Sequence, residues 1–287
     1  MPTADVPSRF SDVARYILHT TDFSPESELA FAHALRLAIN NKARLTIMHV
    51  SKDKDADWDN FPSVRTTLQN WGLLEQGARR ADVSKMGVQI EKIHVPDTSN
   101  VVGAVTGYLQ KAPVEILVLA TQRRKGWATW FNPSTAEQVS RHLSVPTLFV
   151  PAGARGCVDL ETGQVSMNQI LIPVDGPKGV GGAIERGLRA LKAFGNADSR
   201  LTLLHVGEES DFPEVVLPEG DWTIVKMCRQ GKPVEEILKA SEELQASLMI
   251  MVTEGSEGIL DKFRGTTTEQ VLHDCPCPLL VIPDSFN

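Results

Sequence analysis

The sequence has few cysteines, no long apolar run and no excess of positive charge. Its four cysteines among 287 residues are too few and too unevenly spaced for a disulfide framework or for a zinc site of four thiolates. No stretch approaches the roughly 18 apolar residues of a membrane-spanning helix, and residues 1–12 lack the apolar core of a signal peptide. A net charge of −7 provides no basic surface for nucleic acid. We therefore expect a cytoplasmic protein that engages neither membranes nor nucleic acid.

Two of the cysteines, Cys275 and Cys277, are separated by a single proline, and this pair admits two interpretations. The close spacing is compatible with a redox or metal site. However, Pro276 and Pro278 hold the segment extended ahead of an apolar strand, which favours two buried thiols. We assign the pair no chemistry.

The chain contains an internal repeat, and an internal repeat indicates how the fold is divided. Residues 43–50 (ARLTIMHV) match residues 199–206 (SRLTLLHV) at an offset of 156. Towards the end of each copy, residues 135–139 (TAEQV) match residues 267–271 (TTEQV) at an offset of 132. The offsets differ by 24 residues, so the second copy has lost about that many.

Each copy alternates predicted strands and helices. Short apolar runs such as Ile116–Leu119 and Leu248–Met251 indicate strands that are buried on both faces, with helical stretches between them. This order predicts an α/β protein of two tandem domains, each a doubly wound parallel sheet. The second domain lacks one helix, because Gly207–Asp221 is too short for the helical pattern that Val64–Lys85 has in the first.

The predicted domains span residues 13–152 and 168–285, and the glycine-containing segment 153–167 is the predicted linker. In an open parallel sheet, ligands bind beyond the carboxyl ends of the strands, where the strand order reverses. The residues at those strand ends are Asp22, Val50 and Ala120 in the first copy and Asp175, Val206 and Val252 in the second.

The loop after Val252 carries glycines ahead of a predicted helix. Its glycines and the adjoining hydroxyl residues are Gly255, Gly258, Gly265, Thr266 and Thr267. Glycine lets a ligand approach the backbone, and a helix start offers unpaired N–H groups to an anion. A turn followed by a helix cap needs the same residues. Spacing alone therefore leaves phosphate binding and capping both open.

Taken together, these features resemble the universal stress protein family. Gly255, Gly265-Thr266 and the following Thr267-Glu-Gln-Val are similar to the family motif G-x-x-G-x9-G-[ST], and the resemblance covers residues 13–151 and 168–284. It implies a Rossmann-like fold of the adenine nucleotide alpha hydrolase type. It also implies a bound adenine nucleotide, ATP, with or without Mg²⁺.

The resemblance further implies a role for each matching residue. Asp175 would lie near the base or ribose, and the backbone of Val206 would contact adenine. The phosphates would be held by Gly255, Gly265, Thr266 and Thr267. In family members the last strand pairs two domains, which implies an intrachain pseudo-dimer through Thr147–Val150 and Leu279–Ile282 and leaves a homodimer of chains open.

The equivalent loop of the first copy departs from the motif. Ala120, Arg123 and Pro133 stand where the motif glycines would be, and only Gly126 and Ser134 remain. Arg123 and the basic residues after it could hold an anion through their side chains. The alternative, which we favour, is a solvated basic loop.

Three classes of function remain. The first is a nucleotide-binding regulatory protein that acts through an unknown protein partner. The second is a slow nucleotide hydrolase that uses Glu254 and a magnesium ion at Thr266. The third is an interaction module whose sites have decayed. No G-x-x-x-x-G-K-[ST] loop is present, and His49 and His205 end apolar strands without a catalytic partner, so we predict a binding protein rather than an enzyme.

Overall fold

The computed structural model describes residues 15–55, 57–121, 145–175, 185, 199–215, 222–253 and 267–283. The elements of the first half are β1 (Tyr16–Thr21), α1 (Pro25–Asn41), β2 (Arg44–Val50), the 3-10 turn η1 (Trp58–Asn60), α2 (Val64–Asn70), α3 (Arg80–Lys85), β3 (Gln89–Val95), α4 (Val101–Leu109), β4 (Ile116–Thr121) and β5 (Thr147–Pro151). Those of the second half are β6 (Gln169–Pro173), β7 (Arg200–Val206), the 3-10 turn η3 (Glu209–Asp211), β8 (Thr223–Arg229), α7 (Pro233–Glu243), β9 (Leu248–Thr253), α9 (Thr267–Asp274) and β10 (Leu279–Pro283).

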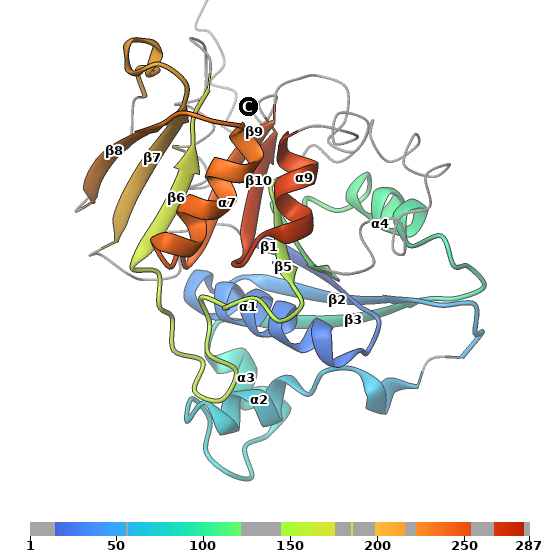
Figure 1. Ribbon diagram of the computed structural model, residues 1–287. Coiled ribbons are helices and arrows are strands. Elements are labelled where there is room, and N and C mark those ends of the chain that lie inside the picture. Colours follow the sequence, from blue (N-terminus) through green and yellow to red (C-terminus); the bar gives the residue numbers. More distant parts are fainter. Residues whose placement is uncertain are drawn as a thin grey trace, which may run out of the picture.

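The described strands form one sheet in the order β3-β2-β1-β4-β5-β10-β9-β6-β7-β8 (Figure 1). Neighbouring strands are parallel within each half, and only β5 and β10 are antiparallel. In that pair Phe149 lies opposite Leu279 and Leu148 opposite Leu280. Two doubly wound halves therefore meet through their last strands, as the resemblance implies.

The strands are buried on both faces because helices cover both sides of the sheet. On one face Ile17 and Ile47 pack in a core with α1, α2 and α3. On the other face Leu18 and Met48 pack in a core that includes residues of α4, α7 and α9. This alternation explains why the strands appear in the sequence as continuous apolar runs.

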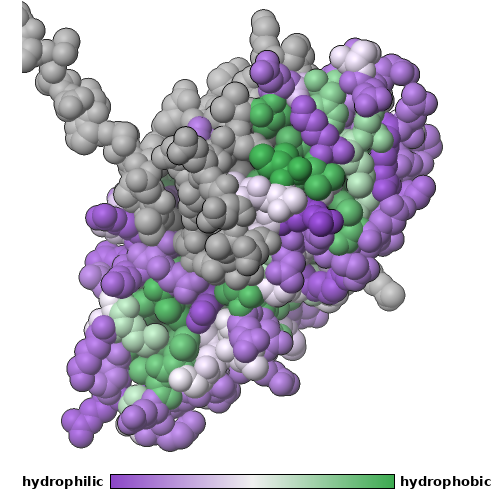
Figure 2. Space-filling view, turned by 90° about the vertical axis from the view of Figure 1, so that its left-hand side faces the viewer, coloured by the Kyte–Doolittle hydropathy of each residue, from purple (hydrophilic) through white to green (hydrophobic). Residues whose placement is uncertain are grey.

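The two halves differ between their second and third strands. In the first half the helical pattern of Val64–Lys85 is divided into α2 and α3, and the connection contains Gly72 and Gly77 at φ of 69° and 83°. Of the residues described between β7 and β8, only η3 has helical structure. Without helices comparable to α2 and α3, Ile224 of β8 is 50% exposed. Apolar surface is correspondingly visible in the upper part of Figure 2, at the height where Figure 1 places β7 and β8.

The segment predicted as a linker packs as a hairpin against the first half. Its two arms are joined by a bridge between Val158 and Val165. The indole Nε1 of Trp71 donates a hydrogen bond to the carbonyl of Leu160 at 2.9 Å. The backbone N–H of Cys157 donates to Nε2 of His33 at 3.1 Å. The segment is thus a structural part of the first half.

The cysteines of the Cys-Pro-Cys segment are buried thiols without a disulfide, and their sulfur atoms lie 3.9 Å apart. This confirms the interpretation as buried thiols. Burial also raises the pKa of Cys157 to about 12, so that its nucleophilic thiolate is absent at neutral pH. Within the described ranges, no group of three His, Cys, Asp or Glu side chains is placed to hold a metal ion, and no helix is both long and apolar enough to cross a membrane.

Candidate functional site

The strand order reverses once in each half, and this reversal locates the candidate crevices. From β1 the chain builds β2 and β3 on one side, and β4 then pairs with β1 on the other. The equivalent reversal in the second half lies between β6 and β9. Ligands of open parallel sheets bind at the carboxyl ends of such strands.

In the second half, three predicted site residues lie at this carboxyl edge. Asp175 follows β6 and is exposed, whereas Val206 at the end of β7 and Val252 near the end of β9 are half-buried. Because β6 pairs with both β7 and β9, these residues come from three adjacent strands. This arrangement is what the sequence predicts.

Buried beside Val206 is His205, whose Nδ1 lies 3.2 Å from the carbonyl oxygen of Val174. This contact assigns the ring proton to Nδ1 and leaves Nε2 as an acceptor. No partner for Nε2 occurs among the described residues. A buried acceptor without a partner is energetically costly.

The predicted phosphate loop and the basic loop of the first half fall outside the described residues. These predictions concern Gly255, Gly258, Gly265, Thr266, Arg123 and Ser134. Thr267 is described, is half-buried, and begins α9.

In the first half, Asp22 organises the start of α1. Its Oδ1 accepts a hydrogen bond from the backbone N–H of Ser24 at 3.0 Å and another from the Ser24 hydroxyl. Val50 ends β2 and is half-buried, opposite Val95 of β3. The Asp22 carboxylate therefore has a structural role in the turn that leads into α1.

Aromatic side chains fill the space beside the end of β2. Phe23, at a φ of 62°, stacks on His49 with ring centroids 3.9 Å apart, and Phe61 packs edge-on against Phe23 at 5.1 Å. Nδ1 of His49 lies 2.8 Å from the carbonyl oxygen of Thr21. The chain's own rings occupy this side of the first crevice, which supports a structural role for His49.

A histidine, a phenylalanine and a lysine recur in the same arrangement in both halves. His49 and His205 each lie edge-on to a phenylalanine, Phe61 at 6.2 Å and Phe212 at 5.8 Å. The ammonium groups of Lys92 and Lys226 lie 5.5 Å and 5.1 Å from the centroids of these two rings. The two lysines hold equivalent register positions, because Lys92 pairs with Ile47 and Lys226 pairs with Leu203.

The sequence did not reveal these phenylalanines and lysines as equivalent, because the connections that contain the phenylalanines and precede the lysine strands differ in length. The strand register was the available signal, since Ile47 and Leu203 are related by the repeat offset of 156. The same register aligns Thr21 with Val174 and therefore Phe23 with Gly176. The residue aligned with Phe23 is thus a glycine, which lies outside the described residues.

Comparison with known proteins decides the family. The model of the Universal stress protein family matches residues 14–151 and 219–283, which is more than half of the chain. The chain belongs to the universal stress protein family. The first matched region contains all five strands of the first half, and the second contains β8, β9 and β10 of the second half.

Curated relatives in this family match parts of the chain. Universal stress protein E of Escherichia coli (strain K12) is 43% identical over 59 residues, which cover 20% of this chain and 19% of that protein. Universal stress protein MJ0531 of Methanocaldococcus jannaschii is 26% identical over 151 residues, covering 43% of this chain and 86% of the relative. The first match thus spans about a fifth of that relative's length.

A solved structure shares the fold over nearly the whole chain. The universal stress protein from Archaeoglobus fulgidus DSM 4304 has a TM-score of 0.57 and 18% sequence identity, with 96% of this chain and 99% of that chain covered. The tandem Rossmann-like arrangement is therefore an architecture of this family.

Proposed function

We propose that the chain binds an adenine nucleotide, ATP, in its second half, and that it acts in a stress response as a regulatory binding protein rather than as an enzyme. The observation that carries this proposal is the contrast between the crevices. In the first half Phe23 stacks on His49, whereas the second half has Gly176 at the corresponding position. A planar base could occupy in the second half the space that a phenylalanine ring occupies in the first.

The residues present fit an adenosine group. His205 Nε2 is a buried acceptor without a partner among the described residues, and the exocyclic amino group of adenine is a donor. Asp175, exposed at the end of β6, is available to ribose hydroxyls. Val206 and Val252 offer half-buried apolar surface on the two strands that flank β6.

The phosphates would be held by the loop after β9. In this proposal the holding residues are Gly255, Gly258, Gly265, Thr266 and Thr267, with Mg²⁺ neutralising phosphate charge where it is present. The start of α9 at Thr267 supplies backbone N–H groups to an anion. Binding would change the state of the tandem, and a protein partner would detect that change.

The test begins with mass spectrometry of any small molecule released from the purified native protein, followed by calorimetric titration with ATP. We expect about one adenine nucleotide per chain and a loss of affinity of at least about 100-fold in Gly265→Glu, because a carboxylate would then face the phosphates. Pro133→Glu, at the corresponding loop position of the first half, is the matched control and should bind as wild type.

Two outcomes would replace the proposal. If millimolar ATP produces no heat and nothing is released from the protein, the chain is an interaction module without a nucleotide site. If wild type releases phosphate from ATP over many turnovers, the chain is a hydrolase. Retained binding in Gly265→Glu would contradict the assignment of the loop.

A further inference from the structure

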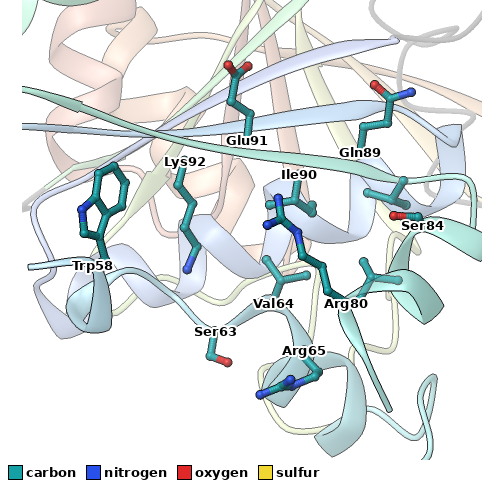
Figure 3. Close-up of a pocket in the computed structure, with 12 residues that line it drawn as sticks. Trp58, Ser63, Val64, Arg65, Arg80, Ser84, Gln89, Ile90, Glu91 and Lys92 are labelled. Atoms are coloured by element: carbon teal, nitrogen blue, oxygen red, sulfur yellow. The ribbon is translucent and has the colours of Figure 1, made fainter.

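A pocket lies against the outer strand β3, and its lining contains none of the predicted strand-end residues. It has a volume of about 690 Å³ and lies between β3 and the segments that contain η1, α2 and α3 (Figure 3). Its strand residues, Val88 to Lys92, belong to the amino-terminal part of β3 and to the residue before it. The carboxyl edge, where the nucleotide is proposed to bind, is therefore not part of this pocket.

The alternation of β3 separates the charges on its two faces. Ile90 and Lys92 face the pocket, whereas Gln89 and Glu91 point to the opposite side of the strand (Figure 3). On that opposite side, Oε2 of Glu91 accepts a hydrogen bond from the hydroxyl of Thr46 at 3.3 Å. The Glu91 carboxylate therefore does not neutralise the cations within the pocket.

Those cations are Arg80 and Lys92, with Arg65 farther from the sheet (Figure 3). None of the three forms an ion pair within the described part of the chain. Nearby Asp82 is already engaged, since its carboxylate accepts hydrogen bonds from Lys85 at 2.8 Å and from the backbone N–H of Arg79 at 2.7 Å.

The surroundings of Lys92 disfavour its positive charge. Partial burial and the charge of Arg80 both lower the pKa of Lys92, and the carboxylate of Asp59 opposes them without cancelling their effect. Two cations that repel each other in a partly desolvated pocket are stabilised by an anion placed between them.

The rest of the lining is apolar and aromatic. Val64 and Val83 are buried walls, on α2 and α3 respectively. Trp58 is 54% exposed at the mouth and stacks on Phe61 at a centroid distance of 5.2 Å, which leaves one indole face available. Such a face favours a flat ligand.

We propose that this pocket binds a small organic anion with an aromatic body, an aryl carboxylate, sulfonate or phosphate, whose charged group lies between Arg80 and Lys92 and whose ring lies against Trp58. The site is specific to the first half. Lys226 occupies the register position of Lys92 in the second half, but the described residues there include no counterpart of α2 and α3, and Ile224 is exposed.

The test uses a matched pair of fluorescent probes with the full chain. The first probe, 8-anilinonaphthalene-1-sulfonate, carries the aromatic body and the anion, and N-phenyl-1-naphthylamine is its neutral analogue. We expect the sulfonate probe to bind wild type and its Kd to rise at least about tenfold in Arg80→Gln/Lys92→Gln, because two charge-assisted contacts are lost. The Kd of the neutral probe should change by less than about twofold, since the apolar walls remain.

Three further variants locate the site. Trp58→Ala should weaken both probes, because each uses the indole face. Lys226→Gln, the matched lysine of the second half, and Gly265→Glu, in the loop proposed to hold the nucleotide phosphates, should bind the sulfonate probe as wild type. Failure of ATP binding would therefore leave this result unaffected.

The proposal is overturned if the double variant binds the sulfonate probe as tightly as wild type, or if Lys226→Gln loses as much affinity as the double variant does. It is also overturned if the double variant loses both probes equally while its thermal midpoint falls, because the pocket would then have lost its structure rather than its charge. Amide chemical shifts that move on titration within residues 58–92 would support it.

Discussion

The two halves of this chain share an arrangement of histidine, phenylalanine and lysine, and they differ in the residue next to that histidine. Each has a histidine near the end of its second strand. This histidine contacts a backbone carbonyl where the first strand ends and lies edge-on to a phenylalanine that a lysine approaches. In the first half a further ring, Phe23, stacks on this histidine. In the second half the corresponding residue is Gly176. Gly176 lies outside the described residues, so the contrast at this position is one of sequence.

The second difference is the pair of helices α2 and α3. They cover β3 and enclose the pocket of Trp58, Arg80 and Lys92 in the first half. The described residues of the second half leave β8 with Ile224 exposed. Within the described ranges, the pocket beside β3 therefore belongs to the first half alone, as expected when a duplicated domain keeps its core and diverges in its loops.

The largest expected difference between the halves is sensitivity to acid, because the first half contains His19 and His33, both fully buried. Burial lowers the pKa of each to about 4, from 6.5 in the unfolded chain. The unfolded state therefore binds protons first as the pH falls, so stability is complete above about pH 6.5 and is lost towards pH 4. At pH 5 each histidine should reduce the free energy of unfolding by about 2 kcal/mol relative to neutral pH.

Urea denaturation between pH 8 and pH 5 measures this effect. The fluorescence of Trp71, which lies in the first half, should report it, with the other tryptophans replaced by phenylalanine. A free energy of unfolding that stays constant over this range would contradict the burial of neutral imidazoles. Protonation of His33 also removes the acceptor that its Nε2 offers to the N–H of Cys157, so the hairpin should detach first.

Almost as large a change in the free energy of unfolding is expected from a substitution in the hairpin, where it packs on the first half. A Cβ at Gly163 would lie 2.3 Å from the Trp71 ring, and Gly163 has a φ of 64°. Gly163→Ala should therefore cost about 3 kcal/mol, from the left-handed backbone and the displaced indole together. Gly153, at a φ of 68° with open space around its Cβ position, is the matched control and should cost about 1 kcal/mol on substitution by alanine.

Chemical denaturation of the two alanine variants compares these costs directly. Equal losses of stability would mean that the hairpin does not press on Trp71. The segment would then be a simple connection between the halves, as its lack of periodicity predicts from the sequence alone.

The repeat and the apolar runs were sufficient to predict the tandem sheets and a shorter connection between the second and third strands of the second half, whereas the pairing of the last strands was predicted only from the family resemblance. The packing of the connecting hairpin was not predictable, because it depends on single contacts such as Trp71 with Leu160 rather than on a period. The sequence also did not predict the aromatic rings around His49. Phe61 reaches that histidine from a loop, and local sequence does not encode where a loop returns.

At pH 7, a smaller change in the free energy of unfolding is expected when a core residue of the first half is replaced by its counterpart in the second. The strand register aligns His19 with Ile172 of β6. His19 Nε2 is buried without a hydrogen-bond partner in the described part of the chain. His19→Ile should raise the free energy of unfolding by about 1 kcal/mol at pH 7 and by about 3 kcal/mol at pH 5, because it removes both the unsatisfied nitrogen and the proton linkage. Urea titrations at the two pH values measure both quantities, and destabilisation at pH 5 would show that the imidazole contributes packing that isoleucine cannot replace.

The smallest effect tests the contrast between the crevices themselves. Phe23→Gly gives the first half the residue of the second. It removes a half-buried ring stacked on His49, which destabilises the fold, but it also relieves a phenylalanine backbone held at a φ of 62°. These contributions oppose each other, so the net loss should be about 1 kcal/mol. Calorimetry should still find one ATP per chain, because the first half lacks the motif glycines at Arg123 and Pro133. A second equivalent bound by Phe23→Gly would mean that the ring alone closes the first crevice, and that its basic loop can hold phosphates without glycine.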